Sequence, residues 1–173
     1  MSAAEAHVTA LGGTFYRIKF LHEAGDILGP ARAPEGRSHY GGQPALYLSK
    51  TPEGTVIAVR RYMRVDDPPR GIFPLRIEAA RVVDLRDPAA TAHFGIDVTH
   101  RAAEWQPIRA TGAPSPTWAI SDRVRALGLD GMLYASRSAP DRTHLTLFRW
   151  NTPGAPRVAT DGPPLPVAAD GCS

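Results

Sequence analysis

Apolar residues in this 173-residue chain recur with two different spacings, which predicts a mixture of strands and helices. Short apolar and β-branched runs predict strands at residues 14–20, 44–50, 73–79, 81–85, 132–135 and 145–150. Apolar residues three and four positions apart predict helices at 51–63 and 115–127, with a shorter helix at 88–94. Because strands also follow one another directly, we expect a single α+β domain with a mixed sheet rather than a doubly wound fold.

The two longer predicted helices carry start and stop signals. A hydroxyl residue followed by proline opens each of them, at Thr51-Pro52 and at Ser115-Pro116, and Gly128 stands where the second should end. Each has an apolar stripe that we expect to face the core: Val56, Val59 and Met63 in the first, and Ile120, Val124 and Leu127 in the second.

Two segments rich in glycine and proline interrupt the pattern. Residues 21–43 predict a long loop, and long loops in compact domains are often functional. Residues 151–173 predict an extended C-terminal segment with one strand at 157–160. We therefore divide the chain into a domain at 1–150 and a C-terminal extension at 151–173.

Composition narrows the classes of function. The net charge is only +3 and acidic residues are interspersed among the arginines, so no basic stripe predicts direct nucleic-acid binding. The single cysteine, Cys172, rules out an intrachain disulfide, and the six histidines show no metal-ligand spacing, so we expect no metal. Neither a secretory signal nor a bilayer-length apolar run is visible, which predicts a soluble cytoplasmic protein without membrane contact.

One segment carries the most specific signal. Residues 36–49 read Gly-Arg-Ser-His-Tyr-Gly-Gly-Gln-Pro-Ala-Leu-Tyr-Leu-Ser, a glycine-rich loop with one arginine that runs into a buried strand. This block and residues 51–59 resemble the RES-domain family of bacterial toxins. Further family motifs are matched in order, over residues 14–150 in all, by Tyr16-Arg17, Arg81–Leu85, Gly128–Ser136 and His144–Phe148.

The resemblance implies a fold similar to that of ADP-ribosyltransferase toxins, in which a split, mixed sheet holds NAD in a central cleft. It also implies an enzyme of the NAD glycohydrolase or phosphorylase type, which attacks the nicotinamide–ribose bond with water, phosphate or a protein side chain as acceptor. Toxins of this family are restrained by a cognate antitoxin, a helical and often DNA-binding protein that lies over the NAD cleft.

The matched motifs name the candidate site residues. Arginine offers forked donors to the phosphates of NAD, and tyrosine can stack on the nicotinamide ring. The resemblance gives these roles to Arg17, Arg37 and Tyr47, with Ser136 and His39 as further cofactor-binding candidates. We expect Arg17, Arg37, Tyr47 and Ser136 to converge on one pocket. A structure that puts Arg17 and Tyr47 on opposite faces of the sheet would contradict the NAD interpretation.

Ala58 is the main departure from the family pattern, which has a catalytic glutamate at this position. Glu53 does not replace it, because five residues turn an α-helix by roughly 140° beyond a full turn. Its carboxylate is better explained by interaction with the helix N-terminus. The glutamate was either removed deliberately or lost in a natural variant. Three functions therefore remain open: an NAD-degrading toxin, an ADP-ribosyltransferase acting on a protein, and a non-catalytic domain that binds NAD or ADP-ribose.

Overall fold

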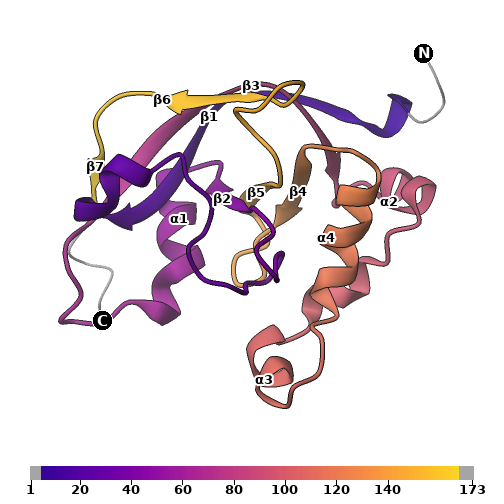
Figure 1. Ribbon diagram of the computed structural model, residues 1–173, viewed down its shortest axis with the longest axis horizontal. Coiled ribbons are helices and arrows are strands. Elements are labelled where there is room, and N and C mark those ends of the chain that lie inside the picture. The colour runs from indigo at the N-terminus through magenta and orange to yellow at the C-terminus, as the bar shows by residue number, and fades with distance from the viewer. Residues whose placement is uncertain (1–4, 168–173) are drawn as a thin grey trace.

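The computed structural model describes residues 5–167 and has the α+β architecture that the sequence predicts, a sheet with flanking helices (Figure 1). The strands are β1 (Thr9–Phe20), β2 (Leu46–Ser49), β3 (Arg70–Asp84), β4 (Gly131–Ala135), β5 (Thr143–Leu147), β6 (Arg157–Thr160) and β7 (Leu165–Pro166). The α-helices are α1 (Pro52–Val59), α2 (Pro88–Phe94), α3 (Trp105–Ala110) and α4 (Thr117–Ala126). Short 3-10 helices are η1 (Glu5–His7), η2 (Leu21–Asp26), η3 (Arg60–Tyr62) and η4 (Val98–Ala102).

The sheet is mixed and closes on itself. Its strand order is β1-β2-β5-β4-β3-β6, β1 also pairs with β3, and β7 pairs with β3. The pairing of β3 with β4 is parallel and the others are antiparallel. Figure 1 shows the short strands β2, β5 and β4 between α1 on one side and α2 and α4 on the other.

The longest pairing joins β1 to β3, from Thr9 opposite Val82 to Phe20 opposite Arg70. The two strands expected at 73–79 and 81–85 are therefore one continuous strand. The irregularity that suggested a break is real, because Ala79 has a left-handed φ of 59° and the register shifts on the partner strand between Leu11 and Gly13. A bulge of this kind bends a strand without ending it.

Two apolar clusters lie on the two faces of the sheet. The inner face, which the closed sheet encloses, carries Phe15, Leu48, Leu75, Leu145 and Leu147. The outer face carries Met132 and Val83, which pack with residues of α2 and α4 such as Phe94 and Val124. Side chains alternate between the faces along each strand, so a residue's position in the register decides which cluster it joins.

The predicted buried face is correct for one of the two longer helices and wrong for the other. In α4, Ile120 and Val124 are buried as expected, Leu127 is half-buried, and Gly128 has the left-handed φ of 69° that ends a helix. In α1 the expected stripe is wrong, because the helix ends at Val59 and buries Gly54 and Thr55 instead. Gly54 packs closely on the sheet, since a Cβ at this position would lie 3.1 Å from the Ser49 Cβ. Its contact with Ser49 places α1 against the outer face.

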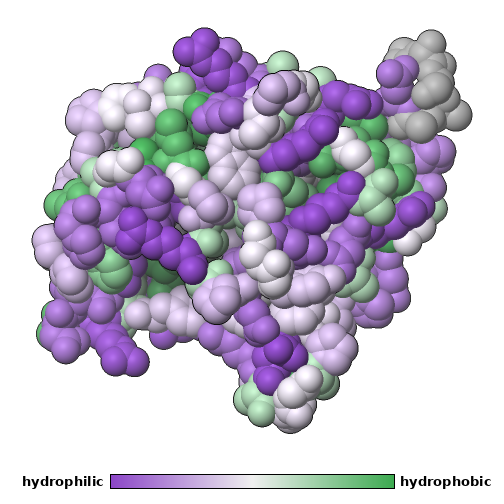
Figure 2. Space-filling view, in the orientation of Figure 1, coloured by the Kyte–Doolittle hydropathy of each residue, from purple (hydrophilic) through white to green (hydrophobic). Residues whose placement is uncertain are grey.

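The strand expected in the C-terminal segment is confirmed by β6, which pairs antiparallel with β3. Cys172 lies outside the described residues. Within residues 5–167, no helix is long and apolar enough to cross a membrane. In Figure 2, hydrophilic residues divide the hydrophobic surface of the viewed face into separate patches.

Candidate functional site

The glycine-rich loop at residues 36–43 is fixed to helix α4 by side chains that bond its backbone. The Trp118 Nε1–H donates to the Gly36 carbonyl oxygen at 2.8 Å, and the Thr117 hydroxyl donates to that of Arg37 at 2.5 Å. The Tyr40 hydroxyl donates to the Asp122 carboxylate at 2.8 Å. These bonds explain why a loop without regular structure can hold the Arg37 side chain in one place.

The loop also meets the sheet at Tyr47. The Ser38 N–H donates to the Tyr47 hydroxyl oxygen at 3.0 Å, and that hydroxyl lies 2.7 Å from His39 Nδ1. His39 Nε2 lies 2.8 Å from the Ala33 carbonyl oxygen, an acceptor, so Nε2 carries the proton and the Tyr47 hydroxyl donates to Nδ1. Burial raises the pKa of Tyr47 above its ordinary value. Both ring nitrogens of His39 are thus used within the protein, and a contact between His39 and a ligand stays a prediction.

Gly36 makes this meeting of loop and sheet possible. A Cβ at position 36 would lie 2.9 Å from the Tyr47 hydroxyl oxygen and 2.7 Å from His39 Nδ1. Any other residue would push the loop away from the strand, so the glycine of this motif is explained by packing.

Two hollows lie beside the loop, and Arg37 lines both of them. The first is a small crevice of about 10 Å³ on the outer face of the sheet, lined by Arg37, Ser38, Arg101, Thr117, Ile120, Met132 and Tyr134. The second lies between η3 and α3, with a volume of about 110 Å³. It is lined by Arg37, Arg61, Glu104, Trp105, Gln106 and Pro107.

Positive charge is concentrated around these hollows. The Arg37 guanidinium donates to the carbonyl oxygens of Arg101 and Ala103, both at 3.1 Å, which holds it between the hollows. Burial, followed by the charges of Arg137, Arg61 and Arg101, lowers the pKa of Arg37. No sequence motif marks these three arginines, because only the fold brings η3, η4 and the turn after β4 together.

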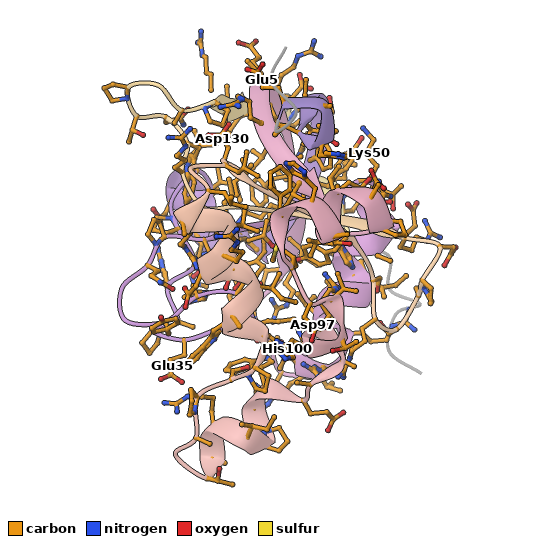
Figure 3. All side chains as sticks on the ribbon, turned by 90° about the vertical axis from the view of Figure 1, so that its right-hand side faces the viewer. Glu5, Glu35, Lys50, Asp97, His100 and Asp130 are labelled. Atoms are coloured by element: carbon orange, nitrogen blue, oxygen red, sulfur yellow. The ribbon has the colours of Figure 1, made fainter. Side chains whose placement is uncertain are left out.

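Arg101 and Tyr134 form a stacked pair in the first hollow. The guanidinium carbon of Arg101 lies 4.2 Å from the centre of the Tyr134 ring, and its Nη2 donates to the Ala135 carbonyl oxygen at 2.9 Å. The Tyr134 hydroxyl lies 2.9 Å from the Thr146 hydroxyl. Arg101 belongs to η4, and Asp97 caps the start of this helix by accepting the Thr99 N–H. Figure 3 shows Asp97 next to His100.

A second polar pair on the outer face joins Ser49 to His144. The Ser49 hydroxyl lies 2.7 Å from His144 Nδ1, and both side chains are buried. Burial, followed by the charge of Arg101, lowers the pKa of His144 from 6.5 to about 4. The imidazole is therefore neutral at pH 7.

Arg17 does not join the other candidates. Tyr16 pairs with Ser49, so alternation places Arg17 on the inner face with Leu48, while Tyr47 lies on the outer face with Ser49. The Arg17 guanidinium donates to the carbonyl oxygens of Ile27 at 2.5 Å and Gly29 at 2.7 Å. Burial lowers the pKa of Arg17 to about 10, opposed by Asp26 and Glu23. Of the four residues expected to converge on one pocket, Arg37 alone lines a hollow, and Arg17 lies on the opposite face of the sheet from Tyr47. The predicted convergence is therefore wrong, which contradicts the NAD site in the form expected from the sequence.

The last two candidates take different places. Ser136 is buried at the end of β4, where its hydroxyl accepts the Ala139 N–H at 3.3 Å and caps a turn. It does not line either hollow. Ala58 is exposed on the final turn of α1, three residues before the Arg61 of the second hollow.

Comparison with known proteins agrees with the sequence motifs. The family model "RES domain" matches residues 14–170. The chain belongs to the RES-domain family. A search of curated proteins gave no match. Seven chains of solved structures match, and one of them comes from the crystal structure of the M. tuberculosis MbcT-MbcA toxin-antitoxin complex. That chain is 18% identical with a TM-score of 0.60, over 91% of this chain and 89% of the other.

Within the RES domain, the described residues that line the two hollows include one carboxylate, Glu104. Its side chain is 68% exposed and lies 3.5 Å from Arg137. The arrangement is therefore one of arginine and aromatic side chains with little negative charge, which suits an anion that also carries rings.

Proposed function

We propose that this RES domain binds NAD in the hollows around Arg37 and acts as the toxin of a toxin–antitoxin pair. The proposed site differs from the one expected from the sequence, because it leaves out Arg17. The observation that carries the proposal is the position of Arg37 between two hollows, with three further arginines and Tyr134 around it.

The geometry suits the parts of a dinucleotide. Guanidinium groups at Arg37 and Arg101 offer donors to a pyrophosphate, and charge-assisted bonds of this kind are about twice as strong as neutral ones. The Arg101 guanidinium already stacks on the Tyr134 ring in a cation–π contact. The Tyr47 ring stands on the same outer face, half-buried, with its hydroxyl fixed by the loop. Its own orientation is thus set before any ligand binds.

The proposed reaction is cleavage of the nicotinamide–ribose bond. Loss of neutral nicotinamide leaves an oxocarbenium-like ribose, which a nearby carboxylate stabilises electrostatically. Ala58 cannot supply that carboxylate, so the residues present favour binding over turnover. A domain that binds NAD or ADP-ribose without cleaving it is accordingly the second candidate, and the absence of a carboxylate at position 58 favours it.

Ala58→Glu tests the catalytic half of the proposal. Because Ala58 is exposed, a glutamate would stay hydrated and the fold should be retained. If the assignment is correct, nicotinamide release should rise by about 10²–10³-fold over the parent. Growth of cells that express the variant without an antitoxin should stop.

Ala92→Glu is the matched control, since Ala92 is an exposed alanine of helix α2 away from the hollows. It should release no more nicotinamide than the parent. A folded Ala58→Glu protein with parent-level release would refute the assignment of position 58.

NAD calorimetry tests the binding half. Arg37→Ala should weaken the binding of NAD by about 10- to 100-fold, which corresponds to the loss of a hydrogen bond to a charged group. No heat of binding from the folded parent chain would refute the NAD proposal as a whole.

The toxin–antitoxin part of the proposal rests on family membership and on the fold shared with a chain of the MbcT-MbcA complex. We expect a partner that restrains an NAD-consuming domain to control access to the hollows. NAD and the partner should then compete, and a ternary complex of unchanged NAD affinity would contradict this arrangement.

A further inference from the structure

The second hollow contains more positive charge than the pyrophosphate of a dinucleotide needs. Arg37 lines it together with Arg61, which comes from η3 after helix α1. Arg137 reaches the same region from the turn after β4, where its guanidinium lies 3.4 Å from the Ala102 carbonyl oxygen and 3.5 Å from Glu104. Three guanidiniums thus face one carboxylate.

Two of these guanidiniums, those of Arg61 and Arg137, make few hydrogen bonds within the described residues. The only hydrogen-bond partner of Arg61 among residues 5–167 is the hydroxyl of its neighbour Tyr62, at 2.6 Å. Among the described residues, the Arg137 guanidinium makes these two long contacts alone, and its side chain is 39% exposed. Arginines that repel one another at close range, with Glu104 as the one carboxylate beside them, cost stability, and a bound anion would offset that cost.

We propose that the second hollow is a subsite for a phosphomonoester, so that this domain prefers a nicotinamide dinucleotide with a 2′-phosphate on its adenosine ribose, as in NADP, over NAD. This proposal rests on the proposed function and adds the class of dinucleotide. The 2′-phosphate is a near-dianion, and three guanidiniums against one carboxylate leave a local charge of the opposite sign and similar size. Arg61 and Arg137 hold the 2′-phosphate, while Arg37 lies between it and the pyrophosphate.

The walls of the hollow support a ribose phosphate rather than a bare ion. Trp105 opens helix α3 and provides an aromatic surface beside the charges, and Gln106 provides an amide. Gln106 is joined to the η3 side by a long contact, 3.5 Å, with the Tyr62 hydroxyl. This contact links η3 to α3 across the hollow, next to Arg61.

The test compares NADP with NAD by calorimetry on the full chain. We expect NADP to bind about 10- to 100-fold more tightly, the value of added hydrogen bonds to a charged group. Arg61→Gln and Arg137→Gln should each reduce the ratio of the two affinities about tenfold. Glu104→Gln should act in the opposite direction and raise the ratio, because it removes the one negative charge of the hollow.

Arg157→Gln is the matched control, since Arg157 is an exposed arginine of β6. It should leave the ratio unchanged. Inorganic phosphate should weaken the binding of NADP more than the binding of NAD if the subsite accepts a phosphomonoester. A titration with phosphate alone shows whether free phosphate also binds in the hollow.

Each outcome decides a different question. NAD and NADP of equal affinity would overturn the subsite and leave the proposed function standing. Variants that weaken both ligands equally would also overturn it, since they would report only the general positive potential. Failure of both ligands to bind would refute the proposed function together with the subsite.

Discussion

The buried pair of Ser49 and His144 makes the stability of this protein depend on pH in a way that one substitution should remove. His144 is 7% exposed, and its pKa is lowered from 6.5 to about 4 by burial and then by Arg101. The folded protein therefore keeps the imidazole neutral down to pH values at which the unfolded chain is already protonated. The unfolded state binds more protons between about pH 6.5 and 4, so stability falls as pH decreases through this window.

The size of the effect follows from the two pKa values. Between pH 7 and pH 5 the free energy of unfolding should fall by about 2 kcal/mol because of His144 alone. The loss should reach about 3 kcal/mol by pH 4. In urea, with a slope of about 2 kcal/mol per molar, the loss at pH 5 moves the unfolding midpoint by about 1 M.

His144→Asn is the perturbation, because asparagine can still bond the Ser49 hydroxyl but does not titrate. Urea unfolding of parent and variant at pH 7, 6 and 5 gives the difference that belongs to His144, since other titrating groups are common to both proteins. His22→Asn, at an exposed histidine, is the control and should behave as the parent does. Parallel pH profiles for the parent and His144→Asn would refute the account of a buried neutral imidazole.

Three further substitutions test the roles assigned above. Arg17→Met leaves the carbonyl oxygens of Ile27 and Gly29 without their donor, so it should lower the free energy of unfolding by about 3 kcal/mol. The affinity for NAD should stay unchanged. Weaker NAD binding by calorimetry would show that Arg17 belongs to the site. Tyr47→Phe removes the bonds to Ser38 N–H and His39, and should cost about 1–3 kcal/mol in urea unfolding. Asp130 is a buried acceptor for the Arg81 N–H and the Arg149 guanidinium, and Asp130→Asn weakens both bonds. Thermal unfolding should then occur at a clearly lower temperature. An unchanged melting temperature would show that the carboxylate of Asp130 is not needed for stability.

Local sequence determined most of the elements. The Thr51 side chain accepts the Gly54 N–H, and Pro52 stands in the first turn, so α1 begins where expected. Helix α2 coincides with the predicted 88–94, because Asp87 caps its start and Gly95 takes the left-handed φ of 63° at its end. Caps and turns depend on a few neighbouring residues, which is why they can be read from the chain.

The family motifs also fixed the glycine-rich loop, but its physical basis became visible only in three dimensions. Gly36 is required because Tyr47 and His39 approach it, and the loop keeps its shape because Trp118 and Thr117 of a distant helix bond its carbonyl oxygens. Such contacts span about eighty positions, and no local pattern encodes them.

The tertiary structure alone decided which residues share a face. Arg17 and Tyr47 each match a family motif, yet the register of β1 against β2 sends them to opposite faces, because one residue of shift exchanges the faces of a strand. Arg61, Arg101 and Arg137 carry no motif, and the folding of three separate segments brings them to Arg37. The sequence determined the family, the elements and the loop arginine, whereas pairing register and chain path determined the charge around it, since both depend on contacts between residues far apart in the chain.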